Sequence, residues 1–271
     1  MNRKLIALDL DGTTLNNQSQ ISQKTSEVLT RLKKEGHIVS IATGRPYRSS
    51  RQYYAELQLD TPIVNFNGAL CHKPTELAWE SQYHKTLNRE IAIDMLSLRK
   101  DMDIQLIAAE LRDSVYVDDD FVPYEDFFAT GKSMSFKLSE DTLKEEPTAI
   151  SVFTGKENQQ AITDKIIHRY GDAVEVRTWG GLTPCLEVVA AGVQKAMGVE
   201  RIAQVYGVQQ KDILAFGDEN NDYEMIQYAG HGVVMNNGID ELKAIADDVT
   251  DFSNHEDGLA LYLEKYFRLI E

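Results

Sequence analysis

Two carboxylates stand two residues apart near the start of this 271-residue chain, directly after the apolar run Leu5–Leu8. Asp9 and Asp11 at that spacing suit a hard cation such as magnesium, whose ligands are oxygen atoms. They also suit a division of labour in which one carboxylate is a nucleophile and the other a general acid and base. Taken alone, the pair is better explained by an acidic turn that caps a helix or is simply solvated.

A second acidic cluster, Gly217–Asp222, follows another apolar run, Ile213–Phe216, and begins a predicted helix. Asp218 and Asp222 are four residues apart, which is about one helical turn. Helix capping accounts for one or two acids at such a position, because they interact favourably with the helix dipole. Capping accounts less well for two strand ends with the same acid-rich chemistry. Together the clusters predict at least three carboxylates around one metal ion.

Two further segments could hold an anion. The Thr43 hydroxyl can donate to a phosphoryl oxygen, Gly44 permits close approach of the backbone, and Arg45 can pair with a phosphate. Taken alone, this segment is better explained as the start of a helix. Lys195 could supply a point charge for phosphate, although a single lysine is ordinarily a solvated surface residue.

Short apolar runs alternate with helix-like segments in the first and last parts of the chain, which predicts a parallel sheet covered on both faces. In such sheets ligands bind beyond the carboxyl ends of the strands, where all the polar clusters fall. The expected strands are Leu5–Leu8, Ile38–Ala42, Ile63–Phe66, Ile213–Phe216, Gly232–Met235 and Asp248–Thr250, and the expected helices include Ala196–Tyr206, Glu224–Tyr228 and Glu241–Ala246.

The middle of the chain has a different pattern and predicts an inserted α+β module. The expected division is a core of residues 1–82 and 192–271 and an inserted domain of residues 83–191. The insert is expected to contain helices Arg89–Arg99 and Gln159–Tyr170 and strands Ile104–Ala108, Ser114–Val117, Ile150–Phe153, Val174–Thr178 and Leu186–Val189. Its aromatic residues Tyr116, Tyr124, Phe127, Phe128 and Trp179 could line a pocket, but such residues are more often core.

The composition limits the classes of partner that this protein is expected to bind. A net charge of −15 argues against nucleic acid or an anionic membrane surface, since both are bound by basic stripes. The two cysteines have no metal or redox spacing, no apolar run approaches a membrane span, and no signal-peptide pattern stands at the start. We therefore expect a cytoplasmic protein that binds a small molecule, as a monomer or weak homodimer.

Taken together, the four motifs resemble those of the haloacid dehalogenase-like superfamily, in the same order. The resemblance is closer to its Cof-type phosphatases, whose further landmarks are similar to Asn67-Gly68-Ala69, Leu186-Glu187-Val188, Gly232–Asn237 and Glu256-Asp257-Gly258. The resemblance covers both halves of the core. It implies a doubly wound, Rossmann-like α/β core with an inserted α/β cap that sets substrate specificity.

The resemblance also implies roles for individual residues. Asp9 would be the nucleophile and Asp11 the general acid and base. Magnesium would bind the carboxylates of Asp9 and Asp218 and the main-chain carbonyl of Asp11, with Asp222 close by. Thr43 and Lys195 would complete the catalytic set. The residues expected to contact the substrate are Leu10, Thr43, Gly44, Arg45, Asn67, Gly68, Lys195 and Asn221.

The resulting hypothesis is a magnesium-dependent phosphatase that hydrolyses small phosphate monoesters, either sugar phosphates or phosphorylated cofactors, through an aspartyl-phosphate. Two alternatives stay open. A phosphomutase of the same superfamily would pass the phosphoryl group to a second hydroxyl, but the basic residues of the insert form no obvious second phosphate motif. A non-catalytic sugar-phosphate sensor would have no need of both Asp9 and Asp11.

Overall fold

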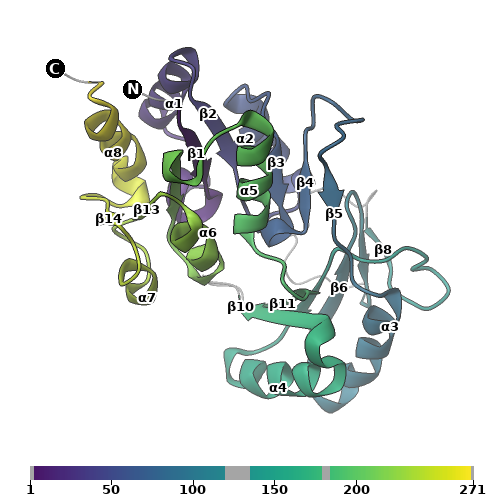
Figure 1. The fold of residues 1–271 in the computed structure, drawn as a ribbon. Helices are drawn as coiled ribbons and strands as arrows, with labels where there is room; N and C mark the ends of the chain where they lie inside the picture. Colours follow the sequence, from purple (N-terminus) through teal and green to yellow (C-terminus); the bar gives the residue numbers. More distant parts are fainter. Residues whose placement is uncertain (1–2, 120–134, 179–183, 270–271) are drawn as a thin grey trace. The chain divides into compact units, whose positions relative to one another are not determined.

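The computed structural model describes residues 3–119, 135–178 and 184–269 (Figure 1). The chain divides into two compact units. The first unit comprises Met1–Arg45, Ser50–Tyr83 and Gln194–Glu271, and the second comprises Pro46–Ser49 and His84–Val193. Each unit contains its own sheet and its own apolar core.

The first unit is built on a five-stranded parallel sheet with the strand order β14-β13-β12-β1-β2. Its strands are β1 (Leu5–Leu8), β2 (Ile38–Ile41), β12 (Ile213–Gly217), β13 (His231–Val234) and β14 (Asp248–Val249). All residues of β1, β2 and β12 are buried, so the uninterrupted apolar runs reflect strands that are covered on both faces. Leu8 pairs with Phe216 at the carboxyl ends of the two central strands, which brings the polar segments after them together.

Helices pack on this sheet in pairs: α1 contacts α8, and α5 contacts α6 (Figure 1). Their bounds are α1 (Gln23–Lys34), α2 (Tyr47–Glu56), α5 (Lys195–Tyr206), α6 (Tyr223–Tyr228), α7 (Asp240–Lys243) and α8 (Gly258–Phe267). The Ser22 side chain caps α1 by accepting the Thr25 N–H. The expected helix Glu241–Ala246 is shorter here, because the N–H groups of Ile245 and Ala246 bond to carbonyls three residues back and tighten the chain after Lys243.

A small second sheet contains β3 (Ile63–Asn65), β4 (Leu70–His72) and β5 (Tyr83–His84), of which β3 and β4 belong to the first unit. A bridge between Ala42 and Val64 places β3 beside the end of β2. The turn Phe66–Gly68, which joins β3 to β4, has positive φ at all three residues (51°, 53° and 108°). The apolar run Ile63–Phe66 predicts β3, whereas β4 was not predicted, since a three-residue strand that follows a turn leaves too short a pattern.

The second unit contains a six-stranded sheet with the order β10-β11-β9-β6-β7-β8. Its strands are β6 (Leu106–Glu110), β7 (Val115–Val117), β8 (Ser135–Lys137), β9 (Ala149–Phe153), β10 (Val174–Thr178) and β11 (Cys185–Ala190), and its helices are α3 (Arg89–Leu98) and α4 (Gln159–Tyr170). All strand pairs are antiparallel except β7 with β8. The segment Pro46–Ser49 joins this unit, in which Arg48 and Glu110 form a buried ion pair.

One apolar core of the second unit lies between its helices and its sheet. Ile166 of α4 is fully buried there with Ile150 and Val188, and Tyr116 is partly buried against the same core. Tyr116 is therefore a core residue. The other aromatic residues named above, Tyr124, Phe127, Phe128 and Trp179, lie outside the described residues.

Two adjacent isoleucines of α4 give a direct test of this core. Ile166 is 0% exposed, whereas Ile167 is 48% exposed. Ile166→Ala should lower the free energy of unfolding by about 3 kcal/mol through lost burial and a residual cavity. Ile167→Ala should change it by less than about 0.5 kcal/mol. Denaturant unfolding of the two variants measures the difference, and equal effects would contradict the packing described for α4.

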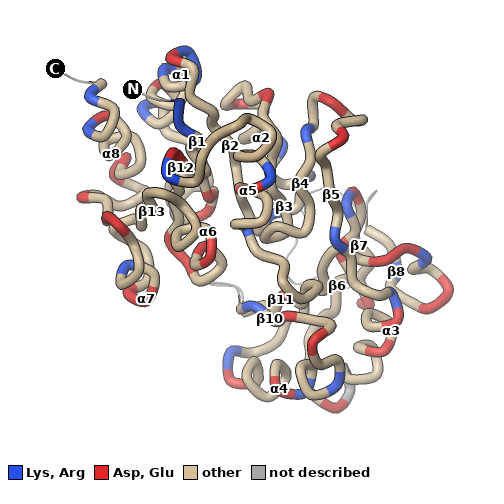
Figure 2. Tube along the Cα trace, viewed as in Figure 1, with Lys and Arg blue, Asp and Glu red and all other residues tan. Residues whose placement is uncertain are grey.

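Charged residues of both signs occur along most of the traced helices, and Lys and Arg do not gather into one stripe on the coloured part of the chain (Figure 2). Among the described residues, no helix combines the length and the apolar character that crossing a membrane requires.

Candidate active site

Lys195 lies at the centre of the candidate site. It is the first residue of α5 and is 0% exposed. Its Nζ donates to Asp9 Oδ1 at 2.6 Å and to Asp222 Oδ1 at 2.7 Å. Burial alone would lower the pKa of Lys195, but the charges of Asp222 and Asp9 outweigh it and raise the pKa above its usual value. Lys195 is therefore a buried, charged member of this site and not a solvated surface lysine.

The carboxylates of Asp9, Asp218 and Asp222 converge, with one oxygen from each lying within 4.8 Å of the others. Burial raises the pKa of Asp9, the Lys195 charge opposes this, and the charges of Asp222 and Asp11 raise it further. Burial also raises the pKa of Asp218, and the charges of Asp9 and Asp222 add to the effect. The single lysine therefore leaves an excess of negative charge in this cluster.

Asp222 is committed to contacts within the protein. While Oδ1 accepts from Lys195, Oδ2 accepts from the backbone N–H groups of Asp218 (3.0 Å) and Glu219 (3.1 Å). Asp222 therefore fixes both the lysine and the loop after β12. Its carboxylate is also completely buried, at 0% exposure.

Asp218 is held from the other side by the turn after β1. Thr13 donates its hydroxyl to Asp218 Oδ1 at 2.8 Å. Gly12 has a φ of +75°, and a Cβ there would lie 2.1 Å from Asp218 Oδ2. Only glycine fits this contact, because a side chain would collide with the carboxylate and the backbone is left-handed.

This donor set fits a hard divalent cation such as magnesium. The three acids offer only oxygen ligands, they lie close together, and their charge is only partly neutralised. Magnesium prefers oxygen ligands of this kind and is commonly bound by one or two carboxylates. Asp9 and Asp218 are the carboxylates that would hold it, because Asp222 already accepts three hydrogen bonds.

Asp11 and Arg45 form a bidentate ion pair. Arg45 Nε donates to Asp11 Oδ2 at 2.7 Å, and Nη2 donates to Oδ1 at 2.5 Å. The guanidinium also lies over the Tyr53 ring, 5.4 Å from its centroid. Burial would lower the pKa of Arg45, but the bonds and charge of Asp11 raise it above its usual value. Arg45, expected to contact the substrate, is bonded here to the expected acid and base.

The other Thr43–Arg45 contacts shape a tight turn. The Thr43 hydroxyl accepts the Arg45 N–H at 3.1 Å, and the Thr43 N–H donates to Val64 O at 2.9 Å. A Cβ on Gly44 would lie 3.0 Å from Asn67 Oδ1, so the loop after β2 touches the turn after β3. Asn67 Oδ1 also accepts from Asn221 Nδ2 at 2.9 Å.

The backbone of Gly68 approaches the start of α5. Its φ is +108°, and a Cβ there would lie 2.1 Å from the carbonyl oxygen of Gln194, the residue before Lys195. The side chain of Leu10 is fully buried, so only its backbone could serve a ligand, and its carbonyl accepts the Leu15 N–H. The predicted residues thus come from four strand ends and one helix start of the first unit.

Four polar residues of this region were not predicted from the sequence: Thr13, Asn65, His72 and Asn237. Asn237 Nδ2 donates to Gly12 O at 2.8 Å and so supports the turn after β1. Asn65 ends the short run Ile63-Val64, and a polar amide in a fully buried strand is the signal that could have identified it. Asn237 ends the landmark Gly232–Asn237, which is a signal of its own, whereas His72 has no comparable signal in its segment.

Comparison with known proteins agrees with this arrangement. The sequence profile of the haloacid dehalogenase-like hydrolases matches residues 6–263. The chain is 38% identical over 268 residues, 98% of both chains, to the 5-amino-6-(5-phospho-D-ribitylamino)uracil phosphatase YitU of Bacillus subtilis. It is 28% identical to YwtE, which carries the same activity name in that organism, over 97% of both chains.

The fold is shared with solved structures. A haloacid dehalogenase-like hydrolase from Bacteroides thetaiotaomicron superposes with a TM-score of 0.84 at 24% identity, covering 98% of this chain and 100% of that one. At that identity the likeness establishes the fold alone. The profile match and the 38% identical relative both span nearly the whole sequence. The chain therefore belongs to the haloacid dehalogenase-like hydrolase family, within its Cof-type phosphatases.

Proposed function

We propose that this protein is a magnesium-dependent phosphatase that hydrolyses small phosphate monoesters through a phosphoryl group carried on Asp9. The observation that supports it best is the bond between Lys195 and Asp9 in a buried cluster with Asp218 and Asp222. Phosphoryl transfer depends mainly on positioning and on neutralising charge. A buried lysine and an acidic metal site beside one carboxylate supply both.

In the first step, an Asp9 carboxylate oxygen attacks the phosphorus atom of the ester. The bond from phosphorus to the leaving-group oxygen breaks as the new bond to Asp9 forms. Asp11, which enters this step protonated and no longer paired with Arg45, gives its proton to the leaving oxygen, so the alcohol departs neutral. The Lys195 ammonium holds Asp9 and balances part of the negative charge of the phosphoryl group.

In the second step, water attacks the phosphorus atom of the aspartyl-phosphate. Asp11, now deprotonated, accepts a proton from the water, and the bond between phosphorus and the Asp9 oxygen breaks. Inorganic phosphate leaves and the Asp9 carboxylate is regenerated. Thr43 and Asn221 would hold the phosphoryl oxygens, with the backbone N–H groups that follow Leu10 and Thr43. Magnesium on Asp9, Asp218 and the Asp11 carbonyl would lower the charge repulsion between substrate and nucleophile.

The proposed substrates are phosphorylated cofactors, their precursors and sugar phosphates. Two relatives are named for 5-amino-6-(5-phospho-D-ribitylamino)uracil, and one of them is 38% identical over nearly all of both chains. That compound is therefore the first ester to test. The second unit, which interrupts the sequence of the first, would act as the cap that selects the organic part of the substrate.

The test is release of inorganic phosphate from a panel of esters that contains this uracil derivative, several sugar phosphates and phosphorylated cofactors. We expect magnesium-dependent release with a preference for one chemical class. Transfer of phosphate to a second hydroxyl without release would support a phosphomutase instead. Binding of an ester without either reaction would support a sugar-phosphate sensor. Either of these two results would overturn the proposed hydrolysis.

Metal binding can be measured apart from turnover. Magnesium should raise the melting temperature of EDTA-treated wild-type protein, because a ligand that binds only the folded state stabilises it. Asp218→Asn should remove most of that increase, since it removes a charged ligand from the cluster. The exposed Asp240→Asn serves as the matched control and should keep the increase. An unchanged response in Asp218→Asn would exclude Asp218 as a ligand.

A further inference from the structure

We propose that Asn65, oriented by His72, is a positioning residue that fixes Arg45 and through it the carboxylate of Asp11. Asn65 is 0% exposed and His72 is 3% exposed, so neither forms part of the surface. The proposal rests on the proposed function, because it assigns a reason for the geometry of Asp11 in its deprotonated form, which accepts the proton from water in the second step. It adds two buried residues of β3 and β4 to the machinery.

The side-chain amide of Asn65 contacts the backbone of Arg45 directly. Asn65 Nδ2 donates to the Arg45 carbonyl at 2.8 Å and to Ser50 Oγ at 2.9 Å. A buried amide that lost these acceptors would leave polar groups without partners, which is costly. Asn65 therefore ties β3 to the last residue of the turn after β2.

The orientation of the Asn65 amide follows from its partners. The Arg45 carbonyl can only accept, so the group that faces it must be the Asn65 NH₂ and the amide oxygen must point the other way. That oxygen lies 3.0 Å from His72 Nε2. His72 must therefore carry its hydrogen on Nε2 and donate it to Asn65 Oδ1. Asn65 and His72 are placed for this contact by the register of β3 with β4, in which Ile63 pairs with His72.

The Asn65 amide also restrains the turn after β2, which ends at Arg45. The other hydrogen bond to the Arg45 carbonyl, from the Phe66 N–H, is long at 3.4 Å, whereas the Asn65 bond is 2.8 Å. The Arg45 N–H is bonded to Thr43 Oγ1. Asn65 thus supplies the shorter restraint on the carbonyl side of Arg45, at the base of its side chain.

The ion pair between Arg45 and Asp11 connects this restraint to the carboxylate. A bidentate guanidinium–carboxylate pair requires both groups in one plane at fixed separation, so it transmits a shift of the arginine backbone to the carboxylate. Arg45 bonds both oxygens of Asp11, which is otherwise the more exposed partner, with its side chain 57% exposed. Without a fixed Arg45, the Asp11 carboxylate would sample several rotamers. Misplacement of a catalytic group by about 1 Å can cost about 100-fold in rate.

The main experiment is a double-mutant cycle on kcat for hydrolysis of the best ester. Asn65→Leu should lower kcat between about 10-fold and about 100-fold, with KM changed by less than about threefold. In an Arg45→Ala background, Asn65→Leu should add less than about a twofold further loss, because its effect acts through Arg45. Ser50→Ala is the matched control: it removes the other acceptor of the same amide and should stay within about twofold of wild type. Equal losses from Asn65→Leu in both backgrounds would overturn the proposal.

Substitutions of His72 give a second test, in which Asn65 and its bond to Arg45 are kept. His72→Leu removes the donor to Asn65, whereas His72→Gln can donate from its amide. His72→Leu should lower kcat at least about fivefold, and His72→Gln should recover most of it. Equal kcat in the two variants would exclude an orienting role for the His72 hydrogen bond, because a purely structural role would follow side-chain volume and stability.

A spectroscopic measurement separates this proposal from the proposed function. The NMR resonance of the Arg45 Nε–H hydrogen can be assigned by its loss in Arg45→Lys. This hydrogen should exchange slowly with solvent in wild type and in Ser50→Ala. In Asn65→Leu it should exchange rapidly, because the ion pair is no longer held in place. That result would support the positioning role even if no ester were hydrolysed. A slowly exchanging resonance in Asn65→Leu would refute it.

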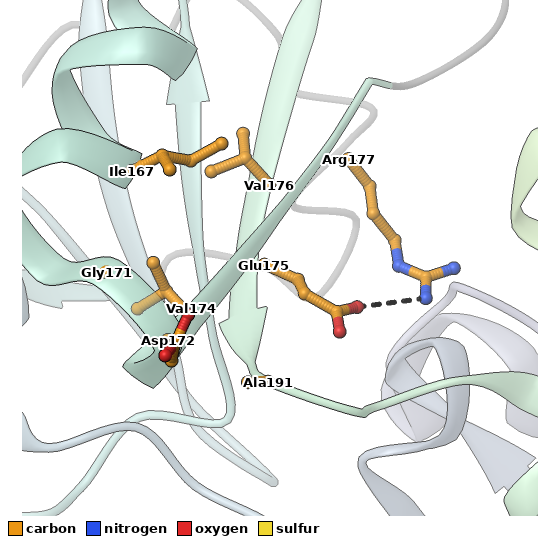
Figure 3. A pocket seen from close by; sticks show the side chains of 8 residues that line it. All are labelled: Ile167, Gly171, Asp172, Val174, Glu175, Val176, Arg177 and Ala191. Carbon is orange, nitrogen blue, oxygen red and sulfur yellow. Dashed lines mark hydrogen bonds and ion pairs between the residues drawn. The ribbon is translucent and has the colours of Figure 1, made fainter.

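The second unit also has a hollow, of about 490 Å³, beside β10 and the end of α4 (Figure 3). Arg177 and Glu175 pair at its edge, and Arg177 also donates to Val193 O while Glu175 accepts the Gly192 N–H. These contacts anchor the chain where it leaves the second unit, so we assign the hollow no ligand.

Discussion

Asp9→Asn should abolish phosphate release, lowering kcat by a factor on the order of 10⁴ or more, as expected when a covalent nucleophile is lost. The reason is chemical, since an amide is a poor nucleophile and forms no stable phosphoryl ester. The fold should persist, because Asn keeps the shape of Asp and removes one of three crowded carboxylates. Phosphate release, together with a melting curve for each protein, measures both expectations.

The control for this variant is the exposed Asp240→Asn, which should hydrolyse like wild type. Asp9→Asn should still bind the ester, because the other groups around the phosphoryl position are retained. Turnover within about tenfold of wild type would rule out Asp9 as the nucleophile and would require another group, or water, to attack phosphorus directly.

Lys195→Met should damage both activity and stability. The change leaves the Asp9 and Asp222 carboxylates buried without their shared cation. Removing one partner of a buried ion pair costs about 3 to 5 kcal/mol. Since Lys195 is also the buried cation beside the proposed nucleophile, kcat should fall about 100-fold to 1,000-fold.

Lys211→Met, which changes an exposed lysine, is the control and should alter neither quantity measurably. Denaturant unfolding with EDTA present separates the stability effect from any compensation by a metal ion. If Lys195→Met retained wild-type stability under those conditions, the bonds from Lys195 to the two carboxylates would make no net contribution to the free energy of unfolding. Wild-type kcat would remove Lys195 from the catalytic set.

The sheet of the first unit was predictable because its strands are buried on both faces. Such strands appear as uninterrupted apolar runs, and each run stops where a polar segment begins, as at Leu8 and Phe216. The bounds of β1 and of α4 agree with the prediction to the residue, and those of β6 differ by two. The strand β4 was missed because three residues between turns show no periodicity.

The site was only partly predictable for a different reason. Side-chain partners depend on contacts between distant segments: Lys195 bonds Asp9 across 186 residues, and Arg45 bonds Asp11 across 34. The sequence indicates that these residue types suit phosphate chemistry, but it does not indicate which charge pairs with which. Arg45 was expected to face the substrate for this reason, and its pairing with Asp11 emerged only from the structure.

The most direct test of the central claim is detection of the phosphoryl group on the nucleophile. Asp11→Asn should slow the attack of water on the intermediate. An activated ester such as 4-nitrophenyl phosphate needs no proton on its leaving oxygen, so it should still phosphorylate Asp9 in this variant. A rapid acid quench after mixing the variant with this ester and magnesium should therefore trap phosphorylated protein. Peptide mass spectrometry should then find one added phosphoryl group on the peptide that contains Asp9, and none when Asp9 is also changed to Asn. Absence of any protein-bound phosphate during turnover, or its location on another residue, would contradict the account.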